Sequence, residues 1–205
     1  MTRIEEILSF WFGEIDAGGL ATTAQAKRWF RASAETDNLI LERFETDLQK
    51  AIQGQLTSWE QYPRGRLALI VLLDQFSRNI YRGTARAFAQ DELALSLCLQ
   101  GIDIGHDLAL RPIERTFYYL PMEHAESLEM QDRCVQHYEQ LVASLPPGSG
   151  GEASAFAQLC AQPSRCHRPV RPLPPSQQTV ATGIDGSRTR VSVPGRGYLR
   201  TTVII

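Results

Sequence analysis

The chain has 205 residues, a formal net charge of −2 and 43% hydrophobic residues, values that fit one soluble domain with or without a tail. This charge argues against a nucleic-acid-binding surface, and no apolar run approaches the ~18 residues that a membrane span needs. The total hides a split, because residues 1–145 carry a net charge of −7, whereas residues 146–205 carry +5 and eight of the eleven prolines. We therefore predict an acidic domain followed by a basic tail of different character.

The N-terminal residues do not resemble a signal peptide. Glu5 and Glu6 stand where a signal peptide is positively charged, and Ile7–Phe12 is too short for its apolar segment, so we expect a cytoplasmic protein. None of the cysteines forms a Cys-x-x-Cys pair or fits a zinc-binding spacing, which favours no cofactor and no metal. We expect Cys98 and Cys134 to be small buried thiols in helices. The other two cysteines are Cys160 and Cys166.

Apolar residues recur at helical spacing through the first 145 residues. Asp37 is a candidate N-cap, Pro63 suits the first turn of a helix, and Gly13 and Gly101 are candidate stops. The run Leu67–Leu73 is apolar on every side, which predicts a central helix buried all round. The predicted helices are 3–12, 24–32, 37–54, 64–81, 87–99, a short helix after Pro112 that carries Phe117 and Tyr118, and 123–144, whose apolar stripe is Leu128, Val135, Tyr138 and Leu141.

No stretch of the first 145 residues alternates with period two, so the predicted fold class is all-α. A stack of helical hairpins of the tetratricopeptide kind and an irregular helix bundle both remain open, because no clean repeat of roughly 34 residues is present. The predicted organisation is a helical domain over 1–145 and a linker over 146–162, with room for a short helix at 153–161. A disordered or non-native tail over 163–205 follows.

A polar cluster follows the buried run directly. Asp74 and Arg78 are four residues apart, so on a helix the carboxylate and the guanidinium share a face and can pair. Charges beside such an apolar run are costly to bury unless they are paired. One interpretation is a structural ion-pair network that uses Asp91 or Glu126 as a further carboxylate, and this interpretation has the larger weight. The other is a site in which Arg78 and Arg82 hold an anionic ligand.

A second candidate lies at His124 and Glu126, at the start of the last predicted helix. Glu123 and Glu126 suit the positive end of a helix dipole, which explains both without a function. His124 could serve as a general base, although a single histidine is more often a partner in a hydrogen-bond network. The spacing matches no His/Glu metal motif, so the sequence predicts no metal site here.

Four segments resemble family 924 of the bacterial domains of unknown function. They are Ile7–Gly13, Leu72–Gly83 with its Asp-Gln-Phe-x-Arg-Asn block, Ala87–Asp91 and Phe117–Gln131, and the resemblance spans roughly residues 4–142. It implies a helical, tetratricopeptide-like fold and no established activity. Ser77 stands where the family usually has proline, and Ala125 where it has serine. The polar positions that match the family are Asp74, Gln75, Arg78, Asn79, Arg82, Asp91, His124, Glu126 and Gln131.

The tail departs from the family, which normally continues into Arg-Phe-Gly-Arg-Phe-Pro-His-Arg-Asn. One permitted choice of codons for Arg168–Gln177, read one base later, encodes Val followed by that motif. We therefore expect that translation leaves the native reading frame somewhere in 145–163, so that the charge of the tail says nothing about partners. For the helical domain two functions remain open. The first is a binding or scaffold module for a protein or peptide, and the alternative is a small-molecule enzyme or anion-binding protein using Asp74, Arg78, Arg82, His124 and Glu126.

Overall fold

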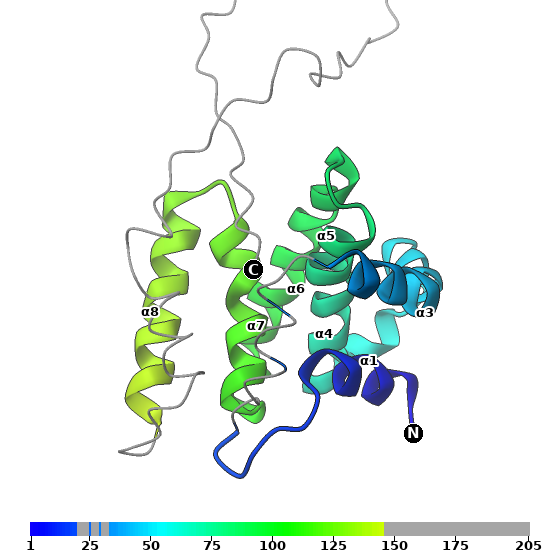
Figure 1. The fold of residues 1–205 in the computed structure, drawn as a ribbon. Helices are drawn as coiled ribbons and strands as arrows, with labels where there is room; N and C mark the ends of the chain where they lie inside the picture. The colour runs from blue at the N-terminus through cyan, green and yellow to red at the C-terminus, as the bar shows by residue number, and fades with distance from the viewer. Residues whose placement is uncertain (20–24, 26–28, 30–32, 146–205) are drawn as a thin grey trace, which may run out of the picture. The chain divides into compact units, whose positions relative to one another are not determined.

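A computed structural model describes residues 1–19, 25, 29 and 33–145, all of which belong to one compact unit of the chain. These residues form helices and no β-strand, as predicted (Figure 1). The α-helices are α1 (Arg3–Phe12), α3 (Ala34–Ile52), α4 (Pro63–Ile70), α5 (Ser77–Ile80), α6 (Asp91–Asp103), α7 (Pro112–His124) and α8 (Leu128–Ser144). Short 3-10 helices lie at η1 (Thr57–Gln61), η3 (Ala85–Phe88) and η4 (Asp107–Ala109), and η2 (Val71–Phe76) is a π-helix.

Helix α1 has the predicted bounds. The side chain of Thr2 accepts a hydrogen bond from the backbone N–H of Glu5, and Gly13 ends the helix with a φ of 62°, which favours glycine. Its buried face packs against α4, and Arg64 of α4 binds Glu5 of α1 through two hydrogen bonds of 2.6 and 2.7 Å (Figure 1). The first helix is therefore held by both its apolar face and an ion pair.

The central helix runs from Pro63 to Ile80 as α4, η2 and α5 in succession. Pro63 occupies its first turn, where the missing N–H costs no hydrogen bond. Every residue of Leu67–Leu73 is 3% exposed or less, which confirms the prediction of a segment buried all round. The π-helical turn at Val71–Phe76 was not predicted. A π turn inserts one residue into an α-helix, and such turns often occur at functional sites.

Helix α3 begins earlier than predicted. Ser33, not Asp37, is the N-cap, because the Ser33 hydroxyl accepts a hydrogen bond from the backbone N–H of Thr36. Asp37 lies inside the helix, and its carboxylate binds Asn79 and Arg82 instead. The prediction of an Asp37 cap was therefore wrong, because a tertiary contact uses that carboxylate.

The helix predicted over 87–99 is displaced. Helix α6 spans Asp91–Asp103, and the residues before it form η3. Gly101 is not the predicted stop but lies inside α6, where a Cβ atom would come within 1.6 Å of the Tyr118 hydroxyl and 2.5 Å of Arg66 Cδ. Gly101 is therefore needed for the close approach of α7 and α4 to α6.

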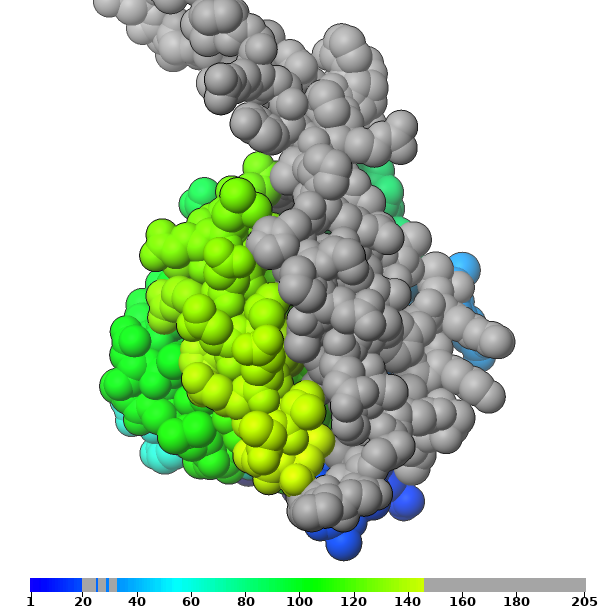
Figure 2. All heavy atoms as spheres, turned by 90° about the vertical axis from the view of Figure 1, so that its left-hand side faces the viewer, coloured from blue at the N-terminus to red at the C-terminus, as the bar shows by residue number. Residues whose placement is uncertain are grey.

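Helix α7 is longer than predicted, and α8 begins later. α7 continues through Pro121 to His124, because its residues Phe117–Met122 are all buried by their neighbours. The chain turns at residues 125–127, and the Ser127 hydroxyl caps α8 by accepting from the backbone N–H of Met130. Leu128 is 65% exposed, so its predicted place in the apolar stripe was wrong. The two helices pack side by side, and the yellow-green atoms of α8 face the viewer in Figure 2.

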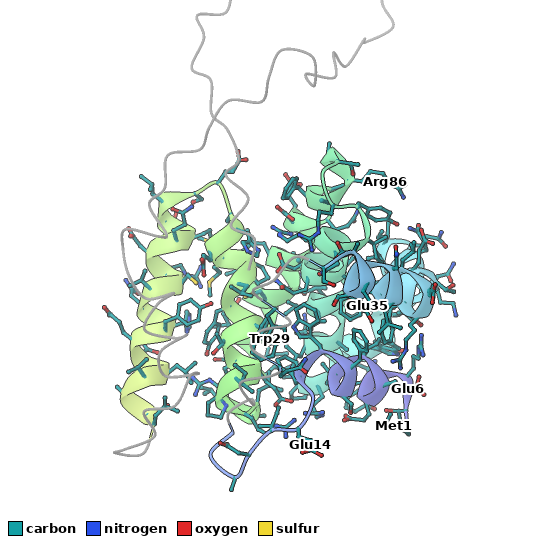
Figure 3. All side chains as sticks on the ribbon, viewed as in Figure 1. Met1, Glu6, Glu14, Trp29, Glu35 and Arg86 are labelled. Carbon is teal, nitrogen blue, oxygen red and sulfur yellow. The ribbon has the colours of Figure 1, made fainter. Side chains whose placement is uncertain are left out.

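The core contains a cluster of aromatic rings between α1, α4–η2 and α7. Trp29 lies inside it, as Figure 3 shows, with its ring centroid 4.6 Å from that of Phe117 and its indole N–H donating to the backbone oxygen of Trp11 at 2.9 Å. Trp11 also contacts Phe76 and Phe117 in edge-to-face geometry. Such pairs stabilise by about 0.5–1.5 kcal/mol each beyond the area that they bury. The two predicted thiols, Cys98 and Cys134, are buried.

Several predictions concern residues outside those described. They include most of the 24–32 helix, the linker and tail from residue 146, Cys160 and Cys166, and the Arg168–Gln177 segment. Within the described ranges, no helix has the length and apolar character required to cross a membrane.

Candidate functional site

Asp74 is the centre of the polar cluster, and it lies on the π-helical turn η2. Its side chain is 0% exposed. One carboxylate oxygen, Oδ1, lies 3.1 Å from Arg78 Nη1 and 2.7 Å from His124 Nδ1, while the amide of Gln75 donates to the other oxygen, Oδ2. A buried carboxylate is expensive unless it is paired and hydrogen-bonded, and Asp74 meets both conditions.

Arg78 connects Asp74 to α6. Its Nη1 and Nη2 atoms donate to the two oxygens of Asp91 at 2.9 and 3.2 Å, and Nη1 also donates to the backbone oxygen of Asp74 at 3.0 Å. The guanidinium lies over the ring of Phe88, 5.4 Å from its centroid. Two carboxylates and an aromatic ring therefore fix the side chain of Arg78, which is 15% exposed.

His124 is the last residue of α7, not part of the helix that follows it as the sequence suggested. Its Nδ1 faces Asp74, and its side chain is 11% exposed. Within the described part of the chain, the other ring nitrogen, Nε2, has no hydrogen-bond partner and is not one of the fully buried polar atoms. One edge of the ring is thus held by a buried carboxylate, and the nitrogen on the opposite edge has no such partner among the described residues.

The charges of this cluster explain the ionisation of Asp74. Burial alone would raise the pKa of its carboxyl, but Arg78 and then His124, with the hydrogen bond from Gln75, outweigh burial and lower the pKa to about 2. Burial likewise lowers the pKa of Arg78, yet Asp74 and Asp91 raise it above its ordinary value. Asp74 is therefore ionised, and Arg78 charged, throughout the physiological pH range.

Asn79 and Arg82 belong to a different cluster, in which both bind Asp37 of α3. Asn79 Nδ2 donates to Asp37 Oδ1 at 2.8 Å, and Arg82 Nε and Nη2 donate to the two oxygens of Asp37 at 2.6 and 2.9 Å. The sequence did not identify Asp37 as a partner. Its only signal was an acidic residue near the start of an amphipathic helix, which an N-cap explains equally well.

The nine polar positions predicted from the sequence thus fall into separate groups of contacts. The structure brings together Asp74, Gln75, Arg78, Asp91 and His124, and it places Asn79 and Arg82 with Asp37. Gln131 donates from Nε2 to the backbone oxygen of Ala125 at 2.9 Å, which stabilises the turn between α7 and α8. Glu126 lies in that turn, and none of the contacts above involves it.

The two arginines predicted to hold an anion are both engaged by carboxylates. The Arg78 fork is bonded to Asp91 and the Arg82 fork to Asp37, so an anion that made the same bidentate contact would have to displace a carboxylate. Among the described residues, no three His, Cys, Asp or Glu side chains are grouped so as to hold a metal ion. Among the described residues, Nε2 of His124 has no hydrogen-bond partner.

Comparison with known proteins identifies the family. The profile of a family described as bacterial protein of unknown function, DUF924, matches residues 7–167. The chain belongs to this family. The solved structure of a protein of unknown function from Agrobacterium tumefaciens is 32% identical in sequence and has a TM-score of 0.62, and the match covers 77% of this chain and 80% of that one. No curated protein matches the chain. These similarities show the family, and they assign no activity to the polar cluster around Asp74.

Proposed function

We propose that this chain binds a small molecule at the accessible edge of His124, and that the helices around it are the scaffold of that site. The observation that supports this function is the pairing of Asp74 and His124. Asp74 lies on η2 and His124 fifty residues later at the end of α7, yet their side chains are 2.7 Å apart. A buried ionised carboxylate that orients an accessible imidazole is an arrangement that binding and catalytic sites use.

The charges favour a neutral or cationic ligand. Asp74, Asp91 and Arg78 together carry a net charge of −1, and both nearby arginine forks are already bonded to carboxylates. A hydroxyl or amine group could donate a hydrogen bond to Nε2, whereas a carboxylate or phosphate would meet the negative charge of the cluster. The anionic ligand considered from the sequence is therefore the less favoured class.

Histidine side-chain NMR tests this proposal. Small alcohols, amines and carboxylates are added one at a time to the full chain, and the ring signals of His124 are assigned by comparison with His124→Gln. We expect alcohols or amines to shift these signals, while the ring of His137, which stacks on Tyr119, stays unchanged. If no compound shifts the His124 signals, or if only carboxylates do, the proposed function is wrong.

A tetratricopeptide-like protein-binding module is the second candidate. Its support is that α6 packs against α7 and α7 against α8, so that consecutive helices are neighbours, and that Ile104 and Leu108 are 62% and 70% exposed. Capture of a bacterial partner by the wild type and by Leu108→Asp tests it, with Leu128→Asp as the control because Leu128 is similarly exposed on α8. Loss of the same partner only in Leu108→Asp supports the module, and equal capture by all three proteins overturns it.

A further inference from the structure

The ionised carboxylate of Asp74 determines which nitrogen of His124 carries hydrogen. Oδ1 of Asp74 lies 2.7 Å from Nδ1 of His124, within hydrogen-bond distance. A carboxylate can only accept hydrogen bonds, so Nδ1 must be the donor. In the neutral imidazole the lone pair then lies on Nε2, the accessible nitrogen. The contact with Asp74 thus places the basic atom of the ring where a ligand can reach it.

The carboxylate itself is held on both oxygens. Arg78 binds Oδ1, the amide of Gln75 binds Oδ2, and Asp91 anchors Arg78 from α6. Asp74 has no exposed surface, so water does not compete for these contacts. The imidazole is therefore oriented by groups that come from the π turn, from α5 and from α6, and this orientation exists before any ligand binds.

We propose that His124 is a general base, which removes a proton from a water molecule or from a hydroxyl group of a small neutral or cationic ligand. This inference rests on the proposed function, because the ligand must reach Nε2. In the step, the O–H bond breaks, the proton goes to Nε2, and the electron pair stays on the oxygen, which becomes the nucleophile. Asp74 remains ionised, stabilises the imidazolium and acts as a positioning residue.

The net charge of the cluster becomes smaller in magnitude during this step. With neutral His124, the side chains of Asp74, Asp91, Arg78 and His124 carry a net charge of −1. The proton received by Nε2 brings this charge to zero.

The tautomer of His124 provides the first test. Long-range proton–nitrogen NMR on the nitrogen-15-labelled full chain distinguishes a hydrogen on Nδ1 from one on Nε2. We expect the Nδ1–H form in the wild type and a loss of that preference in Asp74→Asn, because an amide can both donate and accept. An Nε2–H form in the wild type would overturn the inference, whatever the behaviour of the variant.

The second test uses p-nitrophenyl acetate, a neutral ester whose hydrolysis by water gives acetate and p-nitrophenolate and needs no other reactant. We expect His124→Gln to slow p-nitrophenolate release about tenfold or more, a modest share of the ~100- to 10,000-fold that a general base contributes. Asp74→Asn should also slow release and change its pH profile. The control is His137→Gln, because the ring of His137 stacks on that of Tyr119, with 4.8 Å between the ring centroids, and His137 does not contact Asp74 or His124 in the arrangement described above.

The outcomes separate the two proposals. If alcohols or amines shift the His124 signals but His124→Gln leaves ester hydrolysis unchanged, the proposed function stands and the general base is overturned. If hydrolysis depends on His124 but no alcohol or amine shifts its signals, the base is supported and the proposed ligand class is overturned. Glutamine at position 124 retains a hydrogen-bonding group beside Asp74, so this variant avoids an unpaired buried carboxylate and its fold can be checked by circular dichroism.

Discussion

Replacing Arg78 by alanine leaves the carboxylate of Asp74 inside the protein without its main counter-charge. Arg78 Nη1 is 3.1 Å from Asp74 Oδ1, and Asp74 is fully buried. Removing one partner of a buried ion pair costs about 3–5 kcal/mol, because the remaining charge stays desolvated. Asp91 loses two hydrogen bonds in the same variant. We therefore expect Arg78→Ala to lower the free energy of unfolding by about 3–5 kcal/mol.

Arg82→Ala is the matched control, since Arg82 also binds a carboxylate through two hydrogen bonds. Its side chain and that of Asp37 are 32% and 17% exposed, so this pair should contribute only about 1 kcal/mol. Urea unfolding at neutral pH, followed by circular dichroism and extrapolated linearly to water, measures both losses. The reasoning about buried charge fails if Arg78→Ala costs no more than Arg82→Ala.

A second variant shows whether the cost arises from the carboxylate left behind. Asparagine at position 74 removes the charge that Arg78→Ala leaves unpaired, so the double variant Asp74→Asn/Arg78→Ala should lose less than the sum of the two single variants. Additive losses would mean that the two side chains stabilise the fold independently, which the 3.1 Å contact contradicts.

Four further expectations follow. The pKa of Asp74 is about 2 against an ordinary 3.8, so its ionisation contributes about 2 kcal/mol to the free energy of unfolding. This contribution is complete above about pH 4 and disappears as the pH falls through 2. Acid unfolding of Asp74→Asn should lack this pH dependence. Gly101→Ala should cost about 1–3 kcal/mol in urea unfolding because its methyl group would overlap the Tyr118 hydroxyl, whereas the exposed Gln100→Ala should be nearly neutral. Tyr118→Phe removes a buried hydroxyl that has no partner among the described residues, so its melting temperature should equal or exceed that of the wild type. Sequencing the gene across codons 145–163 should reveal a gained or lost base, and an intact frame there would refute the frameshift hypothesis.

Local patterns were sufficient where a single helix determines the outcome. The apolar run Leu67–Leu73 and Pro63 at its start indicated a buried central helix, and the spacing of Asp74 and Arg78 indicated their pairing. Each of these features depends on residues within one or two helical turns. Helical periodicity and first-turn chemistry therefore predict them without knowledge of the tertiary structure.

The remaining features depend on contacts between distant segments. Gly101 resembles a helix stop in the sequence, but the approach of Tyr118 is what requires a glycine there. Asp37 resembles an N-cap, yet Asn79 and Arg82 bind it from a segment more than forty residues away. The partnership of His124 with Asp74 is equally non-local, and no spacing within either helix indicates it.

The π turn changes which side of the central helix faces its neighbours. Before it, α4 packs against α1 and α6, and after it, α5 packs against α3 and η3. Loss of one residue between Val71 and Phe76 would rotate everything that follows by about 100° around the axis, since an α-helix turns by that angle per residue. Arg78 would leave Asp91, and Asn79 would leave Asp37, although every side chain was still present. The site therefore depends on the number of residues in this turn as strictly as on their identity.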